Sequence, residues 1–148
     1  MNSQLTENNE ASMFVTAWLG IVDITTGHMQ CASAGHEYPM IRQPGGLFEV
    51  LRDRHGVALG SLPGLRYRDY ELELPKGSTL FVYTDGVPEA QDVRQELFGL
   101  ERTLQALNEA PDAEPQALLA HVQQAVDRFV DGAPQFDDLT MLCWKRNM

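Results

Sequence analysis

The stretch FVYTDGVPEA, from Phe81 to Ala90, carries an apolar run directly into an Asp-Gly pair. Apolar side chains occupy both alternating positions of this run, which predicts a strand that is buried on both faces. Asp85 follows at the end of the strand. A second acidic pair, Asp137 and Asp138 in QFDDLTML, stands directly before another apolar, strand-like segment. Carboxylates at strand ends can converge on one rim of a sheet, so these three aspartates are considered together.

The three aspartates admit two interpretations. Mg²⁺ and Mn²⁺ prefer oxygen ligands, and two such ions about 3.5–4 Å apart can orient a phosphate and activate a bridging water. Alternatively, Asp-Gly is a common turn, and an aspartate pair before a strand often binds backbone amides. The residues taken alone leave both interpretations open.

Length and composition limit the class of protein. A chain of 148 residues with 43% hydrophobic residues predicts a single soluble domain over residues 1–148. No apolar run approaches the ~18–20 residues that span a bilayer, and the polar N-terminus lacks a signal-peptide core, so we expect a cytoplasmic protein without a membrane partner. The two cysteines, Cys31 and Cys143, lie in strand-like segments and are predicted to be reduced core residues.

The net charge of −10 argues against a nucleic-acid partner, because phosphate backbones are bound through clustered basic residues. The basic residues are scattered along the chain. The one loose group consists of Arg52, Arg54, Arg66 and Arg68. These arginines form either a solvated loop face or a docking point for a phosphorylated or acidic partner.

Several further segments have the pattern of strands. Residues 13–23 are apolar at both alternating positions, which predicts a strand buried on both faces in the middle of a layered structure. Residues 24–30 predict a turn into a second strand, and residues 39–51 predict a hairpin around a Pro-Gly-Gly loop. Residues 67–75 alternate between apolar and acidic side chains, so one face of this strand is expected to meet water.

Two helices are predicted between the last two strands. Apolar residues recur at helical spacing in residues 97–110 and again in residues 114–132. Pro115 suits the first turn of the second helix, and Gly132 suits its end. The pattern predicts an α/β (α+β) domain, rich in antiparallel strands, with helices packed on the sheet.

Five segments in order resemble the SpoIIE/RsbU-like branch of the PPM metal-dependent protein phosphatases. Residues 13–41 resemble a strand–hairpin–strand block that ends in an AGH-P signature, and GVALGSLPG resembles the short loop that follows it. YTDGVPEA resembles the most diagnostic motif of the branch, FGLERTLQAL the start of the next helix, and QFDDLTML the closing strand. Each segment is a weak signal alone, and their shared order makes the resemblance strong.

The resemblance implies a two-layer antiparallel β-sandwich flanked by helices, with metal ions at one rim. It implies a serine/threonine protein phosphatase that hydrolyses phosphoserine or phosphothreonine by metal-activated water, using Mn²⁺ or Mg²⁺. Asp85 and Asp137 match the metal-binding aspartates of the family, and Asp138 takes a supporting position beside them. The expected partner is a phosphorylated anti-anti-sigma-like protein in a signalling pathway that regulates sigma factors.

Other residues of these motifs have more local explanations. Gly86 is expected to allow a tight turn behind Asp85, and His36 is expected to be structural rather than a general acid. Glu89 is placed at the solvated start of the next loop, and Thr140 is expected to make a local hydrogen bond. None of these four residues is assigned to the metal site.

The family pattern also has an earlier half, which supplies a further bridging aspartate and a backbone carbonyl ligand. The resemblance covers the C-terminal two-thirds of the domain, so the two-metal site is expected to be incomplete in this chain. Without the strands of the earlier half, sheet edges are expected to be exposed, and exposed edges favour a homodimer. Two alternatives follow: a non-catalytic module that binds a phosphoprotein or dimerises, and an unrelated metal-binding or structural α/β domain.

Overall fold

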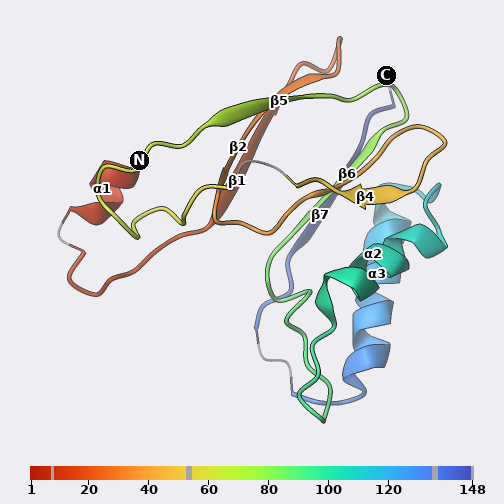
Figure 1. The fold of residues 1–148 in the computed structure, drawn as a ribbon. Coiled ribbons are helices and arrows are strands. Elements are labelled where there is room, and N and C mark those ends of the chain that lie inside the picture. The colour runs from red at the N-terminus through yellow and green to blue at the C-terminus, as the bar shows by residue number, and fades with distance from the viewer. Residues whose placement is uncertain (8, 53–54, 135–136, 148) are drawn as a thin grey trace. The chain divides into compact units, whose positions relative to one another are not determined.

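The computed structural model describes residues 1–7, 9–52, 55–134 and 137–147 (Figure 1). The chain divides into two units. The first comprises Met1–Glu37 and Arg52–Leu74, and the second comprises Tyr38–Leu51 and Pro75–Met148. Each unit contains its own antiparallel sheet.

The first unit holds a three-stranded sheet in the order β1-β2-β5, with a short helix before it. Its elements are α1 (Asn2–Thr6), β1 (Ala17–Val22), β2 (His28–Ala34) and β5 (Asp69–Glu73). The predicted turn between β1 and β2 is confirmed. The Asp23 carboxylate accepts hydrogen bonds from the backbone N–H of Thr25 at 2.8 Å and from its hydroxyl at 2.6 Å. These bonds, led by the one from the hydroxyl, lower the pKa of Asp23 to about 2.

The prediction that residues 13–23 form a strand buried on both faces is wrong. Strand β1 begins only at Ala17 and lies at the edge of its sheet. The Leu19 and Ile21 side chains, which share one face of the strand, are 60% and 64% exposed. The sequence pattern shows that both faces of the strand are apolar, but it does not show whether another layer of the structure covers each face. The alternation predicted for β5 is confirmed, because Tyr70 and Leu72 are half-buried between exposed acidic residues.

The second unit holds a four-stranded sheet in the order β4-β3-β6-β7. Its strands are β3 (Met40–Arg42), β4 (Phe48–Val50), β6 (Thr79–Tyr83) and β7 (Met141–Lys145). The predicted hairpin of residues 39–51 is therefore confirmed. Strand β6 lies inside the sheet, and Leu80, Phe81 and Tyr83 are buried, as the apolar run before Asp85 predicts.

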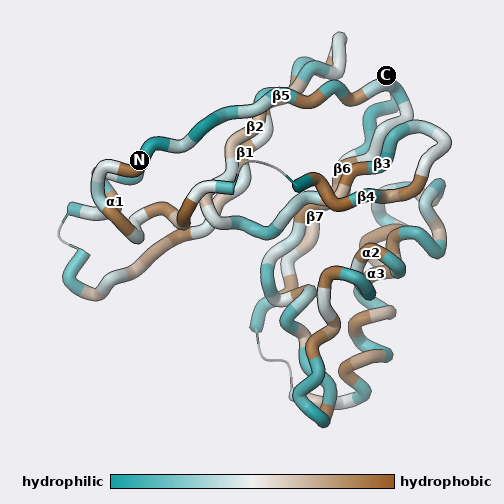
Figure 2. Tube along the Cα trace, viewed as in Figure 1, coloured by the Kyte–Doolittle hydropathy of each residue, from teal (hydrophilic) through white to brown (hydrophobic). Residues whose placement is uncertain are grey.

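Two amphipathic helices belong to the same unit, and Figure 2 shows apolar and polar residues alternating along them. They are α2 (Gly99–Glu109), which contacts β4, and α3 (Pro115–Val130), which contacts β7. Leu107, Leu118 and Val122 are fully buried with Phe81 in the core of this unit. Asp131 takes a left-handed conformation at the end of α3 and Gly132 also has positive φ, so the predicted helix end is confirmed.

Polar contacts connect α2 and the turn after it to the β3–β4 hairpin. The Asn108 side chain accepts a hydrogen bond from the Phe48 backbone N–H at 2.7 Å and donates one to the Phe48 carbonyl at 3.1 Å. The buried Arg42 guanidinium pairs with Asp112 and donates to the Gly46 carbonyl. These contacts thus connect both strands of the β3–β4 hairpin to α2 and the turn after it.

The predicted fold class is confirmed as a mixed α/β fold with two antiparallel sheets and helices. Cys31 and Cys143 are both reduced, as predicted. Burial raises the pKa of the Cys143 thiol to about 11, so this thiol is protonated at neutral pH. None of the helices in the described ranges is long and apolar enough to cross a membrane.

Candidate metal centre at the rim of the four-stranded sheet

Asp85 lies two residues beyond the end of β6, in a single helical turn. The backbone N–H of Val87 donates to the Thr84 carbonyl at 3.1 Å, and that of Glu89 donates to the Asp85 carbonyl at 2.9 Å. The Asp85 carboxylate is exposed and accepts the N–H of Gly86 at 3.1 Å. The turn therefore presents this carboxylate to solvent at the rim of the sheet.

Gly86 packs directly on the segment that carries the other two aspartates. A Cβ atom at position 86 would lie 2.9 Å from the carbonyl carbon of Asp138 and closer still to its oxygen. Gly86 is not among the glycines with positive φ, so the backbone conformation of a turn does not by itself require glycine here. The prediction that Gly86 serves only a tight turn is therefore incomplete. The close approach of two backbones is what requires glycine here.

Thr84, which was not among the predicted site residues, joins the same two segments. Its hydroxyl donates to the Asp138 carbonyl at 3.3 Å and accepts the N–H of Thr140 at 3.2 Å. The Thr84 N–H donates to the Thr140 carbonyl at 3.0 Å. These bonds join the Thr140 backbone to a residue 56 positions away, so the local hydrogen bond expected of Thr140 stays a prediction. No sequence signal marks these contacts, because they depend on the pairing between β6 and β7.

Asp137 and Asp138 lie just before β7, beside the turn that holds Asp85. Strands β6 and β7 are antiparallel with Tyr83 opposite Met141, so the end of β6 and the start of β7 share one rim. Both carboxylates are exposed, and the Asp137 carboxylate accepts the Asp138 N–H at 2.7 Å. The structure therefore brings all three predicted aspartates to one rim of one sheet.

The arrangement places carboxylate oxygens at one rim of the sheet. Exposed carboxylates on one rim are the donors that Mg²⁺ and Mn²⁺ prefer. In the described part of the chain, however, no three His, Cys, Asp or Glu side chains gather closely enough to hold an ion. Carboxylate oxygens suit a divalent cation, but in the described residues too few of these side chains lie close together to coordinate one. The assignment of Asp85, Asp137 and Asp138 as metal ligands stays a prediction.

Two other residues named from the sequence have clear positions. His36 belongs to the first unit, where its ring Nδ1 lies 3.1 Å from the Thr16 hydroxyl, within hydrogen-bond distance. Glu89 is exposed, as predicted for a loop, but the turn places it four residues after Asp85. Side chains four residues apart lie on the same side of a helical turn. Glu89 is thus a further carboxylate beside the candidate centre.

Comparisons with known proteins place this fold among the PP2C-type phosphatase domains. The PP2C phosphatase domain of SpoIIE from Bacillus subtilis, solved with a fragment of its regulatory domain, matches with a TM-score of 0.79 and 18% identity. The match covers 96% of this chain and 41% of that chain. At this level of identity, the likeness concerns the fold.

The family assignment comes from the sequence comparisons. The model of the Stage II sporulation protein E (SpoIIE) family matches residues 1–147, so this chain belongs to that family. Protein IcfG from Synechocystis is 33% identical over 96% of the chain. Phosphoserine phosphatase RsbU from Bacillus subtilis is 25% identical over the whole chain. The chain spans 22% and 44% of the length of these two relatives.

Proposed function

We propose that residues 1–148 belong to a single PPM-type phosphatase domain that removes phosphate from phosphoserine or phosphothreonine in a protein substrate. One observation carries this proposal: Asp85, Asp137 and Asp138 lie at a shared rim, where Gly86 and Thr84 contact the backbone of Asp138. The family match extends over both units of the chain, which supports treating them as one domain.

The proposed cofactor is Mn²⁺ or Mg²⁺. Solved relatives of similar fold include a SpoIIE phosphatase domain soaked with manganese and RsbX in complex with magnesium. Asp85 and Asp137 would hold the cation here, with Asp138 beside them. When bound, such a cation orients phosphate oxygens and lowers the pKa of a bound water. The contacts of Thr84 and Gly86 hold the backbone of the Asp85 turn against the segment before β7.

The proposed substrate is a phosphorylated anti-anti-sigma-like protein in the cytoplasm. The relative RsbU is named a phosphoserine phosphatase, and a solved neighbour contains the RsbU and RsbW domains of one protein from Mycobacterium tuberculosis. Family membership supports a role in signalling by protein dephosphorylation. The excess of acidic residues in this chain favours a protein substrate over nucleic acid.

The test is phosphate release by this chain in millimolar Mn²⁺, from a phosphoserine peptide and from an aryl phosphate. We expect turnover that requires Mn²⁺ and falls at least about tenfold in Asp85→Asn, because the charge at the candidate centre is reduced. Asp69→Asn is the matched control, since Asp69 is an exposed aspartate on β5 of the other unit. Equal activity in both variants would contradict the assignment of Asp85.

A second candidate function is a module of the same fold that binds a phosphoprotein without hydrolysing it. The absence of a closed three-ligand group in the described residues favours this alternative. Metal-dependent turnover separates the two functions. A chain that binds the phosphopeptide in Mn²⁺ but releases no phosphate would support the binding module.

A further inference from the structure

A small hollow opens beside the candidate centre, between α3 and the turn that follows Asp85. Its apolar lining consists of Gly86, Ala90, Val126, Val130, Pro134 and Leu139. Its polar lining consists of Glu89, Gln91, Gln123, Asp127 and Asp137. All of these residues belong to the second unit of the chain.

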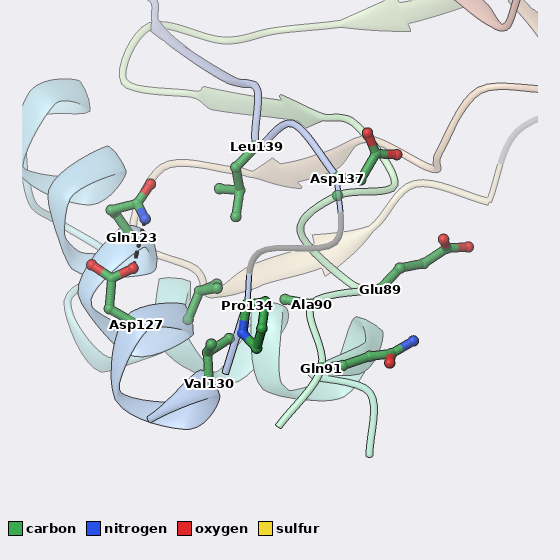
Figure 3. Close-up of a pocket in the computed structure, with 11 residues that line it drawn as sticks. Glu89, Ala90, Gln91, Gln123, Asp127, Val130, Pro134, Asp137 and Leu139 are labelled. Atoms are coloured by element: carbon green, nitrogen blue, oxygen red, sulfur yellow. Dashed lines mark hydrogen bonds between the residues drawn. The ribbon is translucent and has the colours of Figure 1, made fainter. Parts of the chain in front are cut away.

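The charged side chains among the described residues of the hollow are all acidic. Figure 3 shows Asp127 and Gln123 on α3 at one side, and Glu89, Gln91 and Asp137 at the opposite side. The Gln123 amide donates to the Asp127 carboxylate at 2.9 Å, which fixes that carboxylate on the helix surface. Lysine and arginine are absent from the described residues that line the hollow. Apolar side chains that lie between carboxylates suit an elongated cation such as a lysine or arginine side chain.

The hollow is continuous with the candidate metal centre. Asp137 and Gly86 belong to both, and Glu89 follows Asp85 by one helical turn. A phosphoryl group bound to a cation at the Asp85 and Asp137 carboxylates would therefore place neighbouring residues of its peptide over the hollow. The carboxylate of Asp127 lies on the α3 side, at the opposite side of the hollow from Asp137 (Figure 3).

We propose that this hollow binds a lysine or arginine side chain that flanks the phosphorylated residue of the substrate. The aliphatic stem packs on Ala90, Val126 and Val130, and the cationic head pairs with Asp127. The inference rests on the proposed function and adds a sequence preference to it. The charge of the whole chain, −10, favours a basic substrate segment by the same electrostatic attraction.

The experiment compares phosphoserine peptides that carry lysine or norleucine at each of the flanking positions in turn. Norleucine keeps the aliphatic stem and removes the charge. We expect lysine at one position to raise kcat/KM about fivefold over norleucine, mainly through KM, as for a partly exposed ion pair. Asp127→Asn brings this ratio close to one. Asp127→Lys reverses the preference toward a glutamate peptide. Glu101→Gln on α2, an exposed acidic residue outside the hollow, keeps the ratio.

Peptide binding, measured by fluorescence anisotropy in Mn²⁺, separates this inference from the proposed function. A chain without turnover that still binds the lysine peptide more tightly than the norleucine peptide, and loses this difference in Asp127→Asn, supports the pocket while the proposed hydrolysis fails. Equal binding and equal kcat/KM for lysine and norleucine at every position overturn the inference. A lysine preference that survives in Asp127→Asn also overturns it.

Discussion

At the scale of single residues, Gly86 controls how closely two segments of the candidate centre approach. Because an added methyl group would meet the Asp138 carbonyl group, the segments must separate. We expect Gly86→Ala to lower the free energy of unfolding by about 1–3 kcal/mol, as overpacking does, and to reduce Mn²⁺-dependent activity. Urea unfolding and phosphate release are the measurements.

The matched control for that substitution is Gly46→Ala in the β3–β4 hairpin. A Cβ atom there would lie 3.4 Å from the Gln43 carbonyl oxygen, without positive φ. This contact needs only a small adjustment, so Gly46→Ala should retain both stability and activity. Similar stability losses in the two variants would show that the Asp138 contact does not set the requirement for glycine.

Asp92 gives a residue-scale prediction about acid stability. Its buried carboxylate accepts the backbone N–H groups of Arg94 at 2.8 Å and Glu96 at 2.9 Å, and the Arg94 guanidinium at 3.1 Å. The backbone bond from Glu96 is the largest of the causes that lower the pKa of Asp92 below the ordinary 3.8. A lowered pKa in the folded state adds stability above the unfolded pKa, and this stability is lost as pH falls through the folded pKa.

We therefore expect Asp92→Asn to lower Tm at neutral pH and to lose this deficit progressively in acid, below the ordinary aspartate pKa of 3.8. The measurement is thermal unfolding by circular dichroism of both proteins over a pH series. Asp69→Asn, which alters an exposed aspartate on β5, is the control. A deficit that stays constant with pH would show that geometry rather than charge explains the effect.

At the scale of elements, the sequence predicted those whose burial follows from local pattern. The two helices could be predicted from the helical spacing of their apolar residues. Leu107, Leu118 and Val122 lie on the faces that pack in the core of the same unit. Strand β6 was predicted because it is apolar on both faces and lies inside the sheet. The exposure of one face of β1 was not predictable, since an apolar pattern does not say whether a second layer covers it.

The same limit applies to the candidate centre. Asp85 and Asp137 could be named from motifs because their chemistry is carried by side chains in the sequence. The roles of Thr84 and Gly86 depend on the backbone of Asp138, more than fifty residues away, and thus on the register between β6 and β7. Contacts set by strand register are invisible until the pairing is known.

Strand β1 supports a prediction about self-association. It lies at the edge of its sheet, with Leu19 and Ile21 exposed at 60% and 64%. An edge strand offers unpaired backbone groups, and apolar side chains beside them favour pairing with a second copy of the chain. We expect a homodimer by light scattering, and a monomer when Leu19 and Ile21 are both replaced by lysine. The control is Val93→Lys, which alters a 74% exposed residue outside β1. A wild-type chain that stays monomeric over the concentration series would contradict this.

At the scale of the whole molecule, the candidate ligands all belong to one of the two units. Asp85, Asp137 and Asp138 lie in the second unit, together with Trp144 of β7, whereas Trp18 lies in the first. These are the two tryptophans of the chain. Trp18→Phe therefore leaves a single tryptophan that reports on the unit holding the candidate centre.

Metal binding should stabilise that unit, because a cation held by the folded carboxylates shifts the unfolding equilibrium by mass action. At a Mn²⁺ concentration of one hundred times the dissociation constant, the free energy of unfolding reported by Trp144 should rise by about 2.7 kcal/mol. Calorimetric titration supplies the dissociation constant independently of activity. Asp137→Asn should remove the increase, whereas Asp131→Asn should keep it. An increase that persists in Asp137→Asn would place the bound Mn²⁺ away from this rim, and no increase in the unmutated centre would mean that three carboxylates without further ligands do not retain the ion.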